Sequence, residues 1–151
     1  MPRLALAFLA LSAVAALSPG AARADECDGL AQQIAAATGG KVGKRSGPSI
    51  DLRIPGSNRF DVTCRAQPIV QGSSSEARPS AAYFRDLSVA AELVVGESAG
   101  SVQGIIAKAY ETALREGRKS FIQQNGWSAS CYTDSAGSIR TLCSIGRIPP
   151  G

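Results

Sequence analysis

The sequence predicts an α+β domain in two layers: an antiparallel sheet of two hairpins, covered on one face by helices and stapled by two disulfides. Three observations lead to this class. The stretch from Leu93 to Gly117 contains the i, i+3, i+4 apolar spacing of an amphipathic helix. Residues 50–64 and 127–145 alternate apolar and polar side chains, as half-buried strands do. Four cysteines are available to cross-link the elements.

Residues 1–24 have the pattern of a secretory signal peptide. Arg3 supplies the positive start, and the apolar run from Leu4 to Leu17 is long enough for a signal core and short for a membrane span. Ala22-Arg23-Ala24 is an A-x-A cleavage site, which predicts a mature chain beginning at Asp25. No cysteine follows that site directly, so we expect no stable membrane anchor.

Residues 25–151, which number 151 − 24 = 127, have the length of a single α+β domain, and we expect it in the periplasm or secreted. Without the two arginines of the signal, 16 − 2 = 14 basic residues stand against 12 acidic ones. So small an excess gives no reason to expect a nucleic-acid partner. The basic cluster of Lys41, Lys44 and Arg45 lies among glycines and is interpreted as a solvated loop.

The mature chain is expected to begin with a short helix from Cys27 to Ala37. Leu30, Ile34 and Ala37 share one face of this helix, and acidic residues at its start suit the helix dipole. The pair Gly39-Gly40 ends it.

The first hairpin spans residues 50–64, with a Pro-Gly-Ser-Asn turn between its strands. We expect Leu52 to face Val62 on the core side of the sheet. Arg53 would then face Asp61 on the solvent side, where opposite charges form a favourable cross-strand pair.

Two consecutive helices are expected after the main loop of the chain, which is assigned to residues 71–80 because of its serines, glycine and proline. The first helix covers residues 82–95. Gly96 to Gly100 forms the corner, and the second helix ends at Gly117, which suits the left-handed position after a last turn.

The second hairpin is preceded by a short strand, 120–124, and by an Asn125-Gly126 turn. Its two strands, 127–133 and 139–145, are joined by a loop centred on Gly137.

The hairpin pairing predicts the disulfides. It puts Cys131 directly across from Cys143, which leaves Cys27 and Cys64 to tie the first helix to the first hairpin. Each bridge would contribute about 2–4 kcal/mol, mainly by restricting the unfolded chain.

The corner Gly96-Glu97-Ser98-Ala99-Gly100 matches G-x-S-x-G and resembles the nucleophile elbow of carboxylesterases with the α/β-hydrolase fold. The resemblance implies Ser98 as a nucleophile. A serine needs a base to take its proton, that family uses histidine, and this chain has none. We therefore predict no catalytic residue. The free N–H groups around Ser98, Gly100 and Ser101 are instead candidates for binding an anion.

Other chemistry finds little support in the sequence. No C-x-x-C motif and no set of metal-ligating residues is present, so no cofactor and no metal is expected. Trp127 is expected in the core and Tyr132 on the opposite face. Five carboxylates are interpreted as solvated surface charge: Asp51, Asp61, Glu92, Glu97 and Glu111.

These observations favour an exported, disulfide-stabilised binding or interaction module that is not catalytic. Its expected partner is an unknown protein or a small anionic ligand in the periplasm. Two alternatives remain: a Ser98-dependent hydrolase, and an envelope structural or assembly factor that acts through the open face of the sheet.

Overall fold

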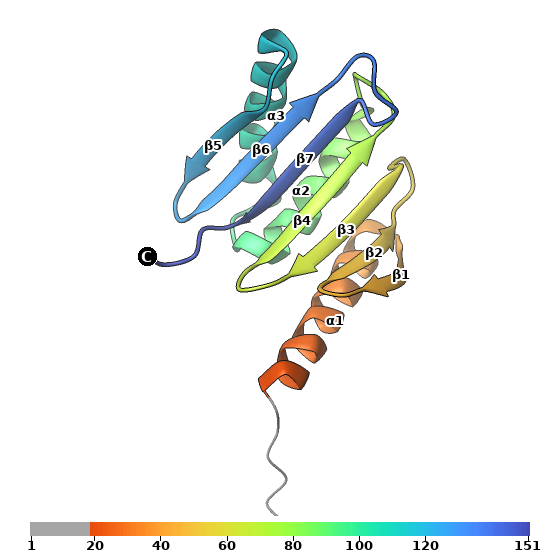
Figure 1. Ribbon diagram of the computed structural model, residues 1–151, viewed down its shortest axis with the longest axis vertical. Coiled ribbons are helices and arrows are strands. Elements are labelled where there is room, and N and C mark those ends of the chain that lie inside the picture. The colour runs from red at the N-terminus through yellow and green to blue at the C-terminus, as the bar shows by residue number, and fades with distance from the viewer. Residues whose placement is uncertain (1–18) are drawn as a thin grey trace, which may run out of the picture.

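Among residues 19–151, which the computed structural model describes, one antiparallel sheet of seven strands packs against three helices (Figure 1). This arrangement confirms the predicted α+β class, with two layers and two disulfides. Most of the predicted signal peptide, residues 1–18, lies outside the described residues.

The chain orders its elements as one helix, four strands, two helices and three strands. In sequence they are α1 (Pro19–Thr38), β1 (Lys41–Ser46), β2 (Ser49–Arg53), β3 (Arg59–Cys64), β4 (Pro68–Ser74), α2 (Ala81–Val95), α3 (Ala99–Glu116), β5 (Ser120–Gln124), β6 (Trp127–Thr133) and β7 (Thr141–Arg147). The order across the sheet is β1-β2-β3-β4-β7-β6-β5. Strands β4 and β7, far apart in sequence, therefore meet at the centre.

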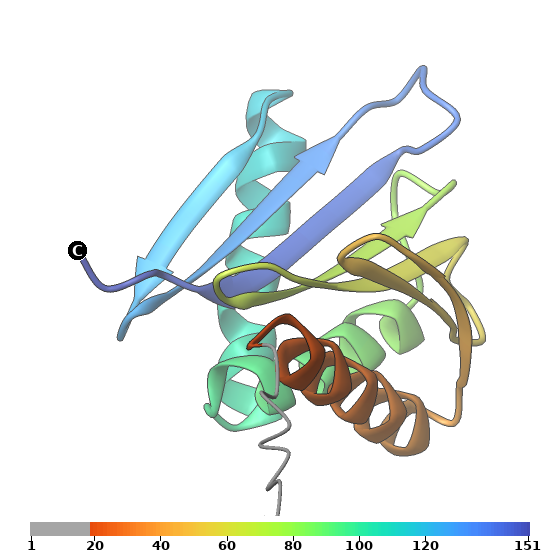
Figure 2. The ribbon, with the colours of Figure 1, turned by 60° about the horizontal axis from the view of Figure 1, so that its bottom comes forward.

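All three helices cover the same face of the sheet. α1 packs on β1, β2 and β3, α2 on β4 and β7, and α3 on β5 and β6 (Figure 1). Figure 2 shows α1 and α2 side by side on this face. Within the described part of the chain no helix lies on the other face, which we call the open face.

The core fills the space between the two layers because each strand turns alternate apolar side chains toward the helices. Phe60, Val62 and Ile145 are fully buried there, as is Trp127 in agreement with the sequence. Tyr83 of α2 is also fully buried, and its hydroxyl donates a 2.7 Å hydrogen bond to the carbonyl of Gly72 in β4.

The register of the first hairpin differs from the expected one by two residues. Leu52 pairs with Phe60 rather than Val62, and Asp61 lies opposite Asp51 rather than Arg53. A slip of two residues keeps every side chain on its face of the sheet, so the apolar pattern is satisfied equally by both registers.

Two segments that were expected to be loops are strands. Residues 41–46 form the edge strand β1, and the first part of the expected main loop, residues 71–74, belongs to β4, which extends to Ser74. β4 looks like a loop in sequence because small residues suit its position. A Cβ on Gly72 would lie 3.2 Å from the ring of Tyr83, so the ring packs directly on the strand backbone.

Both expected disulfides are present, so all four cysteines are paired. Cys27–Cys64 ties α1 to β3, and Cys131–Cys143 joins directly opposed residues of β6 and β7. Structural disulfides form in oxidising compartments, which indicates a location outside the cytoplasm.

Helix α1 includes the last residues of the predicted signal, Pro19 to Ala24. Arg45 of β1 donates to the carbonyl of Ala24 at 3.2 Å and to the carboxylate of Asp28 at 2.6 Å. No single helix among the described residues is long and apolar enough to cross a bilayer. α2 and α3 meet that requirement only as a pair, and they are bent by 116°.

Candidate functional site

The open face carries a row of polar side chains that crosses the sheet. Alternation explains the row, because each strand sends its apolar residues toward the helices and its polar residues outward. Cross-strand pairing places the members of the row side by side in the order Asp51, Asp61, Gln71, Ser144, Ser130 and Phe121. The row thus begins with two carboxylates and ends with an exposed aromatic ring.

The centre of the open face is hollowed. A groove of about 270 Å³ lies over β4, β7 and β6. Small side chains permit this hollow, and its lining consists of Ile69, Gln71, Lys119, Ser128, Ser130, Ser144, Gly146 and Arg147.

Gly146 is required in this groove by a close approach. A Cβ at this position would lie 2.8 Å from Cγ1 of Ile69 and 3.2 Å from the carbonyl oxygen of Pro68. Arg147 also belongs to the lining, but its side chain turns to the helical side of the sheet, where its Nε donates to the carbonyl of Val94 in α2 at 3.0 Å. Lys119 is the remaining cation of the lining.

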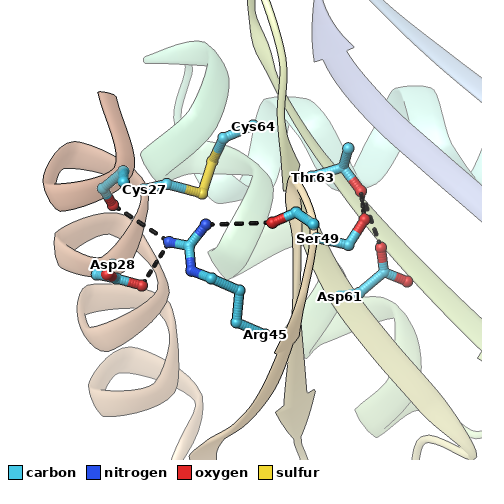
Figure 3. The surroundings of a disulfide bond; sticks show 9 residues. Cys27, Asp28, Arg45, Ser49, Asp61, Thr63 and Cys64 are labelled. Carbon is cyan, nitrogen blue, oxygen red and sulfur yellow. Dashed lines mark hydrogen bonds and ion pairs between the residues drawn. A yellow bond between two sulfur atoms is a disulfide. The ribbon is translucent and has the colours of Figure 1, made fainter. Parts of the chain in front are cut away.

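Asp61 is the most unusual group on the open face, because only 6% of it is exposed. Thr63 Oγ1 donates to its Oδ2 at 3.2 Å and lies 2.7 Å from the hydroxyl of Ser49. Figure 3 shows these three side chains on the side of the strands away from the Cys27–Cys64 disulfide.

The pKa of Asp61 is raised above its ordinary value. Burial is the largest cause, and the facing carboxylate of Asp51 adds to it, while the Thr63 hydrogen bond and the charge of Arg59 oppose it. The interpretation of Asp61 as a solvated surface charge was therefore wrong. The alternation of β3 does not reveal the burial of Asp61, because the side chain lies on the polar face of its own strand and is covered by residues of neighbouring strands.

Arg59 bridges the two facing carboxylates. Its Nη2 lies 3.9 Å from Asp51 and its Nε 3.8 Å from Asp61. The side chain of Arg59 is mostly exposed, so these ion pairs contribute little to stability. The two ion pairs place the guanidinium of Arg59 beside the carboxylates of Asp51 and Asp61 at one end of the polar row.

The predicted anion-binding residues lie at the corner between α2 and α3, away from the polar row. Ser98 is the N-cap of α3, and its Oγ accepts a hydrogen bond from the backbone N–H of Ser101 at 3.3 Å. The N–H of Ala99 donates to the carboxylate of Glu92 at 3.1 Å. Two N–H groups of this helix start thus already have acceptors from the chain itself, and Gly100 follows them in the first turn.

The same corner lacks the context of a nucleophile elbow. An elbow connects a strand to a helix through a strained turn, whereas Ser98 connects two helices. Its φ of −59° and ψ of 143° are ordinary for a helix cap. Glu97 points elsewhere and accepts a 3.3 Å hydrogen bond from Asn125, which ties the corner to the β5–β6 turn.

The surroundings of the Cys27–Cys64 disulfide form a second polar region. Arg45 lies between α1 and the strand layer, where it meets Asp28 (Figure 3). Arg23 and Arg65 line the same hollow, but Arg23 belongs to the predicted signal peptide. In residues 19–151 no group of three or more histidines, cysteines or acids is placed to hold a metal ion.

The polar row and its groove are thus the features that sequence reasoning missed. Alternation of Ser128 and Ser130 with buried neighbours was a usable signal, but the contributions of β4 could not be seen while that segment was assigned to a loop. No family model matches the chain, and no curated protein or solved structure was found to be similar to it.

Proposed function

We propose that this chain is an exported, disulfide-stapled binding module without catalytic residues, that it works in the periplasm or outside the cell, and that its contact surface is the open face. One observation carries the proposal. The three helices and both disulfides lie on or within one side of the sheet, which leaves a polar, grooved surface uncovered on the other.

The shape of the open face favours a protein partner over a small molecule. The groove of about 270 Å³ is smaller than the roughly 300–1,000 Å³ of small-molecule sites. The face of a sheet of seven strands can instead supply the roughly 800 Å² per partner of a standard protein interface. The charges of Asp51, Arg59 and Lys119 at its two ends would fix the orientation of that partner.

Site-specific photo-crosslinking in the producing cell tests the proposal. A photoreactive residue at Ser144 or Ser130 is expected to capture the partner, because both lie in the polar row. The matched control is Glu111, an exposed position on α3. Adducts from Glu111 but not from the row, or adducts from neither surface, would contradict the proposal.

The identity of the captured molecules separates the binding module from the assembly factor. A single protein captured in stoichiometric amount favours an envelope assembly factor, whereas several substoichiometric proteins favour a binding module. Hydrolysis of a chromogenic ester that is lost in Ser98→Ala would instead establish the hydrolase, since Ser98→Ala removes only a helix cap in the present structure.

A further inference from the structure

The two edges of the sheet differ in how they guard their unpaired backbone groups. β1 carries Lys41, Lys44 and Arg45, and its register shifts in a bulge between Val42 and Arg45. Charges and bulges are the usual protection of an edge strand against pairing with another chain. β1 is therefore a guarded edge.

β5, at the opposite edge in Figure 1, has no such protection. Its sequence, Ser-Phe-Ile-Gln-Gln, contains no charge and no proline, and its register with β6 is continuous. Phe121 is 57% exposed on the open face. A neutral edge with a continuous register and an exposed aromatic ring is a surface that other strands can extend.

The outward backbone groups of β5 can be identified from the pairing. The Cα atoms of Cys131 and Cys143 are 4.2 Å apart, as in a non-hydrogen-bonded pair. Cys131 therefore directs its N–H and C=O toward Ser120, its partner in β5. By alternation, Phe121 and Gln123 direct theirs away from β6, to the free edge.

We propose that β5 is a self-association edge, which pairs antiparallel with β5 of a second copy around a two-fold axis at Ile122. This register places Phe121 opposite Gln123 of the second copy, and the two residues would exchange both of their outward N–H···O=C bonds. Ile122 would lie opposite itself, on the helical side of the sheet.

The absence of charge on β5 allows a second copy as the occupant, because no like charges would meet across the pairing. In the two-fold pairing of β5, no charged residue of the strand faces a charged residue. The same operation on β1 would bring Lys41, Lys44 and Arg45 of two copies together, and like charges in opposed strands are destabilising. Pairing through β5 would also merge two open faces into one surface, with Phe121 at the seam.

Proline at Gln123 tests the proposal with little disturbance of the fold. Gln123→Pro removes an outward N–H, which β6 does not use, and proline is tolerated at such edge positions. We expect sedimentation velocity to show a reversible dimer for the mature chain, weakened at least about tenfold by Gln123→Pro because two symmetry-related hydrogen bonds are lost. Gln123→Ala retains the N–H and is expected to dimerise normally.

A cysteine scan tests the register. Ile122→Cys is expected to form a covalent dimer under mild oxidation, because the residue faces itself in the same kind of pair as Cys131 and Cys143. Phe121→Cys and the β1 variant Val42→Cys are expected to form no covalent dimer under the same oxidation, with both native disulfides verified by mass spectrometry. Three results would overturn the proposal: a mature chain that is monomeric at every concentration, a dimer that Gln123→Pro does not weaken, or an Ile122→Cys chain that forms a disulfide only with a different protein.

Discussion

Two buried polar side chains show how single residues shape this domain. The hydroxyl of Tyr83 reaches the carbonyl of Gly72 across the two layers, and burial raises the pKa of this phenol. The carboxyl of Asp61 lies on the other side of the sheet, where burial raises its pKa as well. The Tyr83 hydroxyl stabilises the fold through its hydrogen bond, whereas ionisation of the Asp61 carboxyl lowers the free energy of unfolding.

Tyr83→Phe is expected to lower the free energy of unfolding by about 1 kcal/mol, because it removes a buried hydrogen bond between the helix layer and the sheet. Urea denaturation at neutral pH measures this loss. The control is Tyr132→Phe on the open face, where 39% of the residue is exposed and the change should stay within about 0.5 kcal/mol. Equal losses in the two variants would refute the assigned role of Tyr83.

Asp61 makes stability depend on pH in a defined direction. Because its folded pKa lies above the ordinary value of 3.8, the folded chain binds the proton more tightly than the unfolded chain. The contribution of Asp61 to stability is therefore fully present below that ordinary value and is lost as pH rises through the raised pKa. Asp61→Asn should remove this loss.

The measurement for Asp61 is a series of urea denaturations from acid to neutral pH. Relative to the wild type, Asp61→Asn is expected to gain stability as pH rises, whereas Glu111→Gln, which changes an exposed carboxylate on α3, should follow the wild-type curve. An Asp61→Asn curve parallel to the wild type would show that this carboxyl carries no pH dependence.

At the scale of elements, the disulfides do different work. Cys27–Cys64 holds α1 on β3 across a sequence separation of 37, whereas Cys131–Cys143, with a separation of 12, joins two neighbouring strands that already pair with each other. α1 also packs Ala31, Ile34 and Ala35 into the core, and its Asp28 forms an ion pair with Arg45 of β1. The first bridge therefore adds a covalent link between α1 and the sheet to this packing.

Removal of each bridge in turn tests this difference. From loop length alone, Cys27→Ala with Cys64→Ala should cost about 4 kcal/mol, and Cys131→Ala with Cys143→Ala about 3 kcal/mol. Chemical denaturation gives the two losses, and hydrogen exchange shows which amides lose protection. We expect the amides of α1 to lose protection only when Cys27–Cys64 is removed. A larger loss of stability on removal of Cys131–Cys143 would contradict the greater contribution assigned to Cys27–Cys64.

At the scale of the molecule, the sheet separates the side that stabilises the fold from the side that we propose as the contact surface. Helices, core and disulfides lie on or within one side, and the polar row lies on the other. Substitutions at exposed positions of the open face are therefore expected to alter the proposed contact surface without removing core contacts. This separation is useful to a binding module, since its contact surface can vary while the fold persists.

Two properties of the whole chain are predicted together: the residue at which the mature chain begins and the oxidation state of its cysteines. Mass spectrometry of the secreted or periplasmic protein should give a chain that starts at Asp25, as the A-x-A site requires. Alkylation of the denatured, unreduced chain should label no cysteine, and alkylation after reduction should label all four. A retained Met1, or a thiol that labels before reduction, would contradict export into an oxidising compartment.

Local patterns in the sequence determined the elements that carry a clear period. The spacing of Val102, Ile106 and Ala109 specifies α3, and Gly117 ends it with a φ of 62°. The Asn125-Gly126 turn and the alternation after it specify β6 and β7, and with them the pairing of Cys131 with Cys143. These features depend on neighbours in sequence, which is why they could be predicted.

Tertiary structure alone decided the rest. The register of β2 on β3 was undetermined because a slip of two residues leaves the apolar faces unchanged. β4 was hidden because its glycine and serines are small to fit beneath Tyr83 and between two strands. The polar row and the burial of Asp61 follow from that placement. Periodicity fixes which face a side chain takes, but only packing against distant strands fixes what lies beside it.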